Sequence, residues 1–292
     1  MTPPARALAG LSGRTLRYAE VIPGPDGPRL RRLGAADFDL DAEAAVFETG
    51  DPEALEAIAE ALVEGLGETT ADTLVVAAHP TATTSFFSRL PVGLDADARD
   101  GQLRQETALL ADLAPTQAVR VRAHTVRTEA TAGGDREWIH VVHVAEPVHA
   151  RLSVLADALG VGGYDLADTT RAAAAVATGP GVALVVGAFQ DHTEVAVVHD
   201  GVFLFGTHGP STAPADTAYF ALAALQQAGA DARTLDALLV YGDDATDARL
   251  DLTAEFVGQP SVWLDPFGRF GRRPEADPGE LAAFAPVLGA AL

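Results

Sequence analysis

Residues 182–206 have the sequence VALVVGAFQDHTEVAVVHDGVFLFG, and this stretch decides the fold. Its three apolar runs, 182–186, 194–198 and 202–206, have the length and the β-branched content of buried strands. Asp200-Gly201 separates the last two runs, and Asp-Gly between alternating apolar residues is typical of a two-residue hairpin turn. The stretch therefore predicts three consecutive strands, of which the last two form a β-hairpin.

The residues after this stretch alternate between helical and strand patterns. Apolar residues recur at helical spacing in some segments and form short continuous runs in others. We expect a helix at 216–228, a strand at 235–241, a helix at 248–256, a strand at 261–264 and a last helix at 281–292. Strands followed by helix–strand alternation are typical of α/β folds.

The beginning of the chain repeats this order of elements. Strands at 15–21 and 29–33 flank the turn cluster PGPDGP at 23–28, which predicts a hairpin. A helix follows, with Asp51-Pro52 as its N-cap and first position, and then a continuous apolar strand at 73–78. Because the order occurs twice, the sequence predicts a pseudo-duplicated α/β architecture with two lobes.

A separate α+β unit interrupts the first of these lobes. Its pattern predicts a strand at 85–91, a helix at 95–113, two strands at 118–127 and 137–145, and a helix at 148–159, before an alanine-rich helix at 166–177. The expected domains are therefore a first lobe at 1–83 plus 164–178, an inserted subdomain at 84–163 and a second lobe at 179–292.

Several segments also carry a resemblance to a known family. They are a strand ending in Leu-Pro, a helix containing Glu, a paired strand, a helix ending at a glycine, an aspartate before an alanine-rich helix, the hairpin and the C-terminal strand: Phe86–Pro91, Leu103–Thr107, Trp138–Val144, Leu152–Gly160, Asp165–Ala175, Val195–Phe205 and Val257–Phe267. In these segments the chain resembles the actin-like ATPase superfamily and, within it, the PilM-like type IV pilus assembly proteins, relatives of FtsA. The resemblance implies an actin-like (ribonuclease H-like) two-lobed fold with an inserted α+β subdomain.

The resemblance also implies where nucleotide-binding residues would lie. An active member has an Asp-x-Gly turn on each lobe, where Asp holds the metal and backbone N–H groups cradle phosphates. Here Gly10 and Ser12 occupy the first pair of positions, Gly187 and Phe189 occupy the second, and Gly242 remains of the adenosine-side turn. We therefore expect a pseudo-ATPase without catalytic residues, for which neither ATP nor Mg²⁺ is a cofactor.

The expected partner also comes from the resemblance. PilM-like proteins bind a short N-terminal tail of a membrane partner in a groove between the inserted subdomain and the first lobe. Phe87, Arg99 and Arg104 are the candidates for that groove here. The expected function is a scaffold that binds the cytoplasmic tail of a PilN-like inner-membrane protein. An active ATP-binding protein or sugar-kinase relative is the alternative, and the cytoplasmic domain of a secretion platform is a third reading.

The composition excludes several other functions. The chain has no Cys and no Lys, 41 Asp plus Glu and 20 Arg, for a net charge of −21. Disulfides, thiolate nucleophiles, Walker-type phosphate loops and Schiff bases are therefore excluded, and binding to nucleic acid or to anionic lipid is not expected. A high-salt environment and a GC-rich genome both explain the acidic, lysine-free composition, and the sequence leaves the two open.

No apolar run reaches the about 20 residues that cross a bilayer, so no direct membrane insertion is expected. We expect a cytoplasmic protein that a partner recruits to the inner membrane, as a monomer or an oligomer. No metal site is expected, because His140 and His143 lie at odd spacing in a strand and His149 and His192 add no ligand-spaced pair. The acidic turn 243–247 is expected to be a helix start, with Asp247 as the N-cap.

Overall fold

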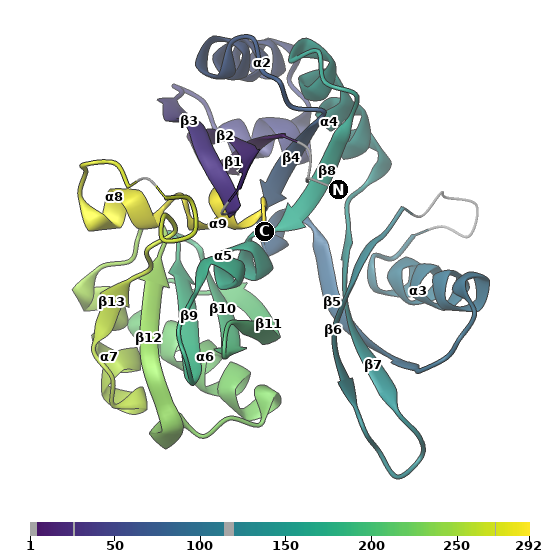
Figure 1. The fold of residues 1–292 in the computed structure, drawn as a ribbon, viewed down its shortest axis with the longest axis vertical. Coiled ribbons are helices and arrows are strands. Elements are labelled where there is room, and N and C mark those ends of the chain that lie inside the picture. Colours follow the sequence, from purple (N-terminus) through teal and green to yellow (C-terminus); the bar gives the residue numbers. More distant parts are fainter. Residues whose placement is uncertain (1–4, 26, 114–119, 272) are drawn as a thin grey trace.

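The computed structural model describes residues 5–25, 27–113, 120–271 and 273–292, and it contains two lobes built on similar sheets (Figure 1). The first sheet has five strands in the order β3-β2-β1-β4-β8. Strands β2 and β3 are antiparallel neighbours, while β4 runs parallel to both β1 and β8. The strands are β1 (Arg6–Ser12), β2 (Thr15–Gly24), β3 (Gly27–Asp37), β4 (Thr73–Ala78) and β8 (Tyr164–Asp168).

The second sheet repeats this order as β11-β10-β9-β12-β13. Three antiparallel strands again precede two parallel ones, so the predicted duplicated α/β architecture is confirmed. Asp200 and Gly201 form the predicted hairpin turn with φ angles of 52° and 75°. The strands are β9 (Val182–Ala188), β10 (His192–His199), β11 (Val202–Pro210), β12 (Leu235–Tyr241) and β13 (Ser261–Trp263).

Helices cover both faces of each sheet and give the two-lobed body five layers (Figure 1). Helices α2 (Pro52–Leu66) and α4 (Glu146–Ala158) pack on the outer face of the first sheet. Helices α6 (Pro214–Ala228) and α7 (Asp247–Val257) pack on the outer face of the second. Short segments complete this set: α1 (Ala42–Ala44), η1 (Ala45–Thr49), η2 (Pro80–Ala82) and η3 (Ala232–Thr234).

The layer between the two sheets consists of α5 (Thr169–Val176), α8 (Pro278–Ala282) and α9 (Ala285–Gly289). Ala173 of α5 belongs to a core cluster with strands of the second sheet, whereas Ala172 belongs to one with strands of the first. Val287 of α9 packs in the first-sheet cluster, although the sequence boundaries assign it to the second lobe. The lobes therefore share their central layer.

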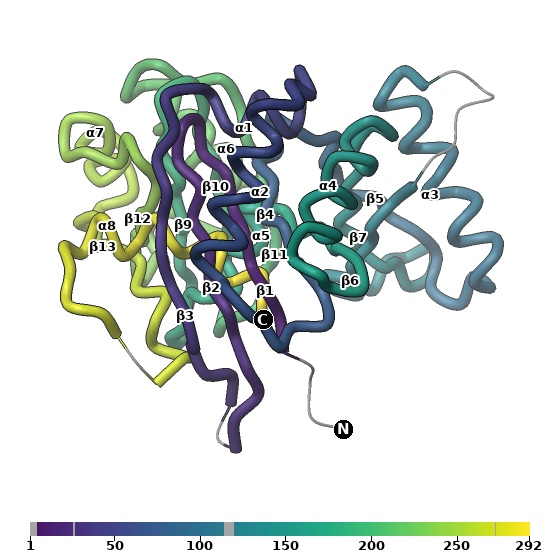
Figure 2. The backbone as a smooth tube through the Cα atoms, turned by 90° about the horizontal axis from the view of Figure 1, so that it is seen from above, coloured from purple at the N-terminus to yellow at the C-terminus, as the bar shows by residue number. Residues whose placement is uncertain are grey.

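Residues 84–143, the first part of the expected insertion 84–163, project from one side of this body as the inserted subdomain, whereas α4 packs on the first sheet (Figure 2). The subdomain's sheet has the order β5-β7-β6, and α3 (Ala96–Leu110) packs on that sheet through Leu103. The strands are β5 (Thr84–Pro91), β6 (Arg122–Glu129) and β7 (Arg136–His143). Residues 118 and 119 of the predicted strand lie outside the described residues.

Three elements differ from the sequence prediction. Strand β1 was missed because its residues are mostly small, and its position between β2 and β4 is what makes it a strand. The predicted helix at 166–177 was wrong at its start: Leu166 belongs to strand β8, and Asp168 caps α5 by accepting from Arg171 N. The predicted last helix is divided into α8 and α9.

Helix boundaries follow local capping chemistry. Asp51 accepts from Glu53 N at the start of α2, and Pro52 occupies its first position, as predicted. The N-cap of α7 is Thr246, so the predicted capping role of Asp247 was wrong, and Asp247 instead opens the first turn. None of the helices in the described parts of the chain is long and apolar enough to cross a membrane.

Contact between α5 and α9 depends on a residue without a side chain. A Cβ atom built on Gly289 would lie 1.8 Å from the carbonyl oxygen of Ala172, which belongs to the backbone and cannot rotate away. Any side chain at this position therefore separates α9 from α5.

We predict that Gly289→Ala lowers the free energy of unfolding by about 1–3 kcal/mol, because the added methyl group overpacks the central layer. Gly101→Ala is the matched control, since Gly101 lies in α3 with open space around it and alanine favours helices. Urea denaturation of both variants measures the difference. Equal midpoints would contradict this account of the central layer.

Candidate functional site

The positions at which a nucleotide site was expected meet where the two lobes face each other. Gly10 and Ser12 at the end of β1, Phe189 after β9 and Gly242 after β12 line one cavity. The free space in this cavity, here called the lobe cleft, is about 20 Å³. A single water needs about 10–15 Å³ of such space, so the lobe cleft has room for little more than one water.

Side chains of the protein occupy the space beside the two glycines. A Cβ on Gly10 would lie 2.7 Å from Cγ2 of Val287, and one on Gly187 would lie 2.5 Å from Cζ of Tyr241. Both neighbours are buried. Glycine here admits the protein's own side chains from α9 and β12, so the close approach that a phosphate would need is already taken.

A fully buried carboxylate, Glu194 of β10, contacts two residues that line the lobe cleft, Thr169 and Tyr241. Its oxygens accept hydrogen bonds from Tyr241 Oη at 2.6 Å, Thr169 Oγ1 at 2.7 Å and Thr170 Oγ1 at 3.3 Å. The two threonines begin α5, and the tyrosine ends β12. Two separate elements, α5 and β12, therefore donate to one carboxylate.

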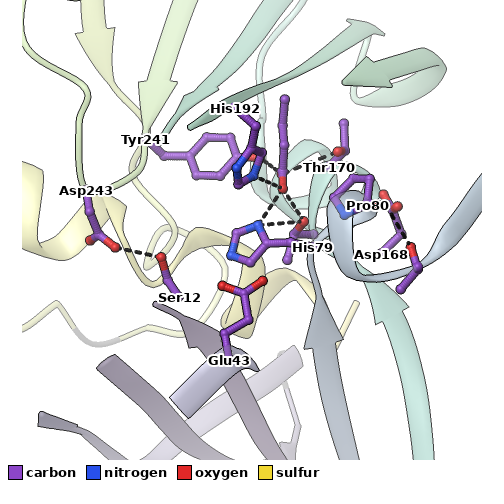
Figure 3. Close-up of polar contacts among 12 residues, drawn as sticks. Ser12, Glu43, His79, Pro80, Asp168, Thr170, His192, Tyr241 and Asp243 are labelled. Carbon is purple, nitrogen blue, oxygen red and sulfur yellow. Dashed lines mark hydrogen bonds and ion pairs between the residues drawn. The ribbon is translucent and has the colours of Figure 1, made fainter. Parts of the chain in front are cut away.

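His79, which follows β4 of the first lobe, completes this arrangement across the lobe cleft (Figure 3). Its Nδ1 lies 2.5 Å from Glu194 Oε1. Burial alone would lower the pKa of His79, but the negative charge of Glu194 outweighs burial and raises the pKa to about 9. Burial would likewise raise the pKa of Glu194, yet the His79 cation holds it well below its usual range. At neutral pH the pair is therefore a buried ion pair between the lobes.

Phe189 packs between the histidines of the lobe cleft. Its ring stacks on His192 with centroids 4.6 Å apart and meets His79 edge-on at 4.6 Å. Asp191 Oδ1 lies 2.7 Å from His192 Nδ1 and fixes the ring. The Phe189 side chain, which was expected to obstruct a phosphate, is thus part of an ordered aromatic cluster.

A second polar bridge closes the outer rim of the lobe cleft. Asp243 of the second lobe accepts from Arg17 Nη2 at 2.5 Å. It also accepts from Ser12 Oγ at 2.8 Å (Figure 3). Arg17 is on β2 and Ser12 ends β1, so both partners come from the first lobe. The carboxylate of Asp243 would also repel an incoming phosphate.

The three candidates for a partner groove do not lie together. Phe87 of β5 stacks on Phe205 of β11 with centroids 5.0 Å apart, and it lines a groove between the inserted subdomain and the second lobe. Arg104 lines a different groove, between the inserted subdomain and the first lobe. Arg99 lines neither groove and instead donates to Thr125 Oγ1 at 2.8 Å.

The groove lined by Arg104, here called the arginine groove, has a volume of about 300 Å³. Arg120 and Arg122 also line it, and each of the three arginines has a carboxylate partner: Asp100, Glu146 and Asp165. Apolar residues lie between them, namely Val121, Val142, Val144 and Leu166. Sequence reasoning missed Arg120 and Arg122, although their alternation at the start of a predicted strand was a usable signal.

Sequence reasoning also missed His79 and Glu194, because they lie 115 residues apart in the chain and in different lobes. The available signal was a glutamate at the start of the otherwise apolar run 194–198. His140 and His143 were predicted to point apart, and they have separate partners, Ser85 Oγ and the Arg120 carbonyl.

Comparison with solved structures identifies the fold of this chain. No protein-family model matches the sequence, and no curated protein matches it. A solved PilM–PilN type IV pilus biogenesis complex is similar with a TM-score of 0.67 and 16% identity, covering 98% of this chain and 97% of that one. A Bacteroides thetaiotaomicron protein with actin-like ATPase fold and unknown function has a TM-score of 0.54 and 10% identity, covering 90% and 91%. The chain has the actin-like ATPase fold.

We predict that His79→Gln lowers the free energy of unfolding by about 3–5 kcal/mol, because it leaves Glu194 as an unpaired buried charge. The double variant His79→Gln/Glu194→Gln should lose less free energy of unfolding than the two single variants lose in sum, since each single change already breaks the pair. Urea denaturation measures all three variants. Arg14→Gln, which breaks an exposed pair with Asp39, is the control and should leave the midpoint unchanged. Additive losses would contradict the coupling.

Proposed function

We propose that this protein is a non-catalytic cytoplasmic scaffold, a PilM-like pseudo-ATPase that binds the cytoplasmic tail of a PilN-like inner-membrane protein. The observation that carries the proposal is that the protein's own side chains close the lobe cleft. His79 and Glu194 bridge it at the centre, and Arg17 and Asp243 bridge it at the rim. These contacts join the lobes directly through the protein's own side chains.

The size and charge of the lobe cleft both disfavour ATP. Ligand pockets typically have volumes of about 300–1,000 Å³, whereas the free space here is about 20 Å³. Asp243 lines the lobe cleft and already holds Arg17 in an ion pair, and the chain has no lysine that could bind a phosphate there. Opening the lobe cleft would also separate the buried ion pair and leave both charges uncompensated.

The arginine groove supports a peptide as the partner. It lies between β6 and β8, each of which is the last strand of its sheet, and Arg122 of β6 pairs with Asp165 of β8 at 2.8 Å. A free strand edge accepts an extended peptide through backbone hydrogen bonds. The apolar floor and arginine rim favour a peptide with alternating apolar and acidic side chains. The similar PilM–PilN structure, itself a complex, is consistent with this assignment.

We predict that ATP with Mg²⁺ leaves the thermal midpoint unchanged, measured in high salt so that the acidic surface is screened. A ligand at about 100 times its dissociation constant would add about 2.7 kcal/mol and raise the midpoint by several degrees. A Mg²⁺-dependent rise would contradict the scaffold proposal and favour the ATP-binding alternative.

We predict that a fluorescent peptide with the N-terminal tail sequence of a PilN-like protein from the same genome binds the arginine groove. Fluorescence polarisation should show at least tenfold weaker binding, about 1.4 kcal/mol, to Arg104→Glu and to Arg122→Glu.

Arg14→Glu is the matched control, because Arg14 also pairs with an exposed aspartate but lies far from the groove in the first lobe. Equal losses in all three variants would indicate a general charge effect and would contradict the groove assignment.

A further inference from the structure

The lobe cleft brings together a second set of groups that the scaffold function does not use. His79, His192 and Glu194 are all buried, and their ligand-type atoms lie within 4.8 Å of one another. Two imidazoles and one carboxylate are a ligand set that holds zinc and related divalent transition ions in proteins. The sequence hid this set, because His79 belongs to the first lobe and the other two residues to β10.

The orientation of His192 is the observation that points to an ion. Asp191 Oδ1 lies 2.7 Å from Nδ1, so in the neutral ring the Nδ1–H group donates to that carboxylate and Nε2 keeps its lone pair. Nε2 is buried, 3.5 Å from Glu194 Oε1, and has no hydrogen-bond partner among the described residues. A carboxylate behind the outer nitrogen is the usual support of a metal-ligating histidine.

We propose that His79 Nδ1, His192 Nε2 and the Glu194 carboxylate form a binding site for one divalent transition-metal ion of the zinc class. Nitrogen ligands disfavour Mg²⁺ and Ca²⁺, which prefer oxygen. Thr169 Oγ1 lies 3.5 Å from His79 Nδ1, and both residues line the lobe cleft, so a water there could supply a fourth ligand.

The two distances from Glu194 Oε1 to the histidine nitrogens require only a small adjustment. Ligand atoms about 2.0–2.1 Å from a tetrahedral zinc ion are roughly 3.3 Å apart. His192 Nε2 and Glu194 Oε1 are already 3.5 Å apart. His79 Nδ1 and Glu194 Oε1, at 2.5 Å, must separate by under about 1 Å as the ion replaces the proton between them, which leaves to solvent.

The site would make the ion a clamp between the lobes. His79 comes from the first lobe, while His192 and Glu194 come from the second, so a bound ion joins the two with coordinate bonds (Figure 3). Glu43 of the first lobe lies beside the His79 ring and provides a further carboxylate near the site (Figure 3). This inference does not rest on the peptide partner, because the arginine groove contains none of these residues.

The test uses the full chain, freed of metal by a chelator and then titrated with Zn²⁺ and with Co²⁺. We expect one ion per chain, a higher thermal midpoint, and the intense visible absorption of four-coordinate Co²⁺. His192→Gln should weaken Zn²⁺ binding at least tenfold, and Asp191→Asn should weaken it about 10–100-fold by releasing the His192 ring.

His199→Gln is the matched control, because His199 also lies beside an aspartate, Asp200 at 3.6 Å, but on the surface. Asp191→Asn keeps the test usable if His192→Gln fails to fold, since it leaves all three ligands in place. No bound ion, a Co²⁺ spectrum of a six-coordinate aquo ion, or equal affinity in His192→Gln, Asp191→Asn and His199→Gln would each overturn the proposal.

Discussion

The structure depends on one buried charge, the carboxylate of Glu194. Removing a carboxylate from water is costly unless its oxygens are fully paired, and here a histidine, a tyrosine and two threonines pair them. These donors lie just after β4, at the end of β12 and at the start of α5, so satisfying Glu194 fixes the positions of three elements from both lobes. The closed arrangement of the lobes follows from this requirement.

The remaining positions of the lobe cleft are consistent with the same constraint. Here Val287 fills the space beside Gly10, Tyr241 fills the space beside Gly187, and Phe189 stacks on His192. At each of these three positions, where the sequence departs from the Asp-x-Gly pattern, a side chain of this protein fills the adjacent space. These side chains join the two lobes directly, which is consistent with the proposed scaffold.

Local signals explain which parts of the fold could be predicted from the sequence. The hairpin at Asp200-Gly201, the cap at Asp51 and the apolar run at 73–78 each carry their cause within a few residues. Strand β8 lacked such a signal, because Leu166 and its neighbours also suit the alanine-rich helix that follows them. The His79–Glu194 pair could not be predicted, since only the packing of two lobes brings these residues together. The family resemblance suggested both Arg104 and Phe87 as groove residues. Arg104 does line the groove beside the first lobe, whereas Phe87 packs against Phe205 of the second lobe.

The acidic composition of the chain limits how much electrostatic attraction the arginine groove can contribute to binding a partner. With 41 acidic residues against 20 arginines, every arginine of the groove is already paired with a carboxylate. An acidic peptide must displace those carboxylates, so its charges contribute little net free energy and salt weakens them further. Salt does not screen apolar burial on the floor of the groove or backbone hydrogen bonds to its strand edges. Affinity should therefore come mainly from backbone pairing and apolar burial, while the arginines select the partner and set its register.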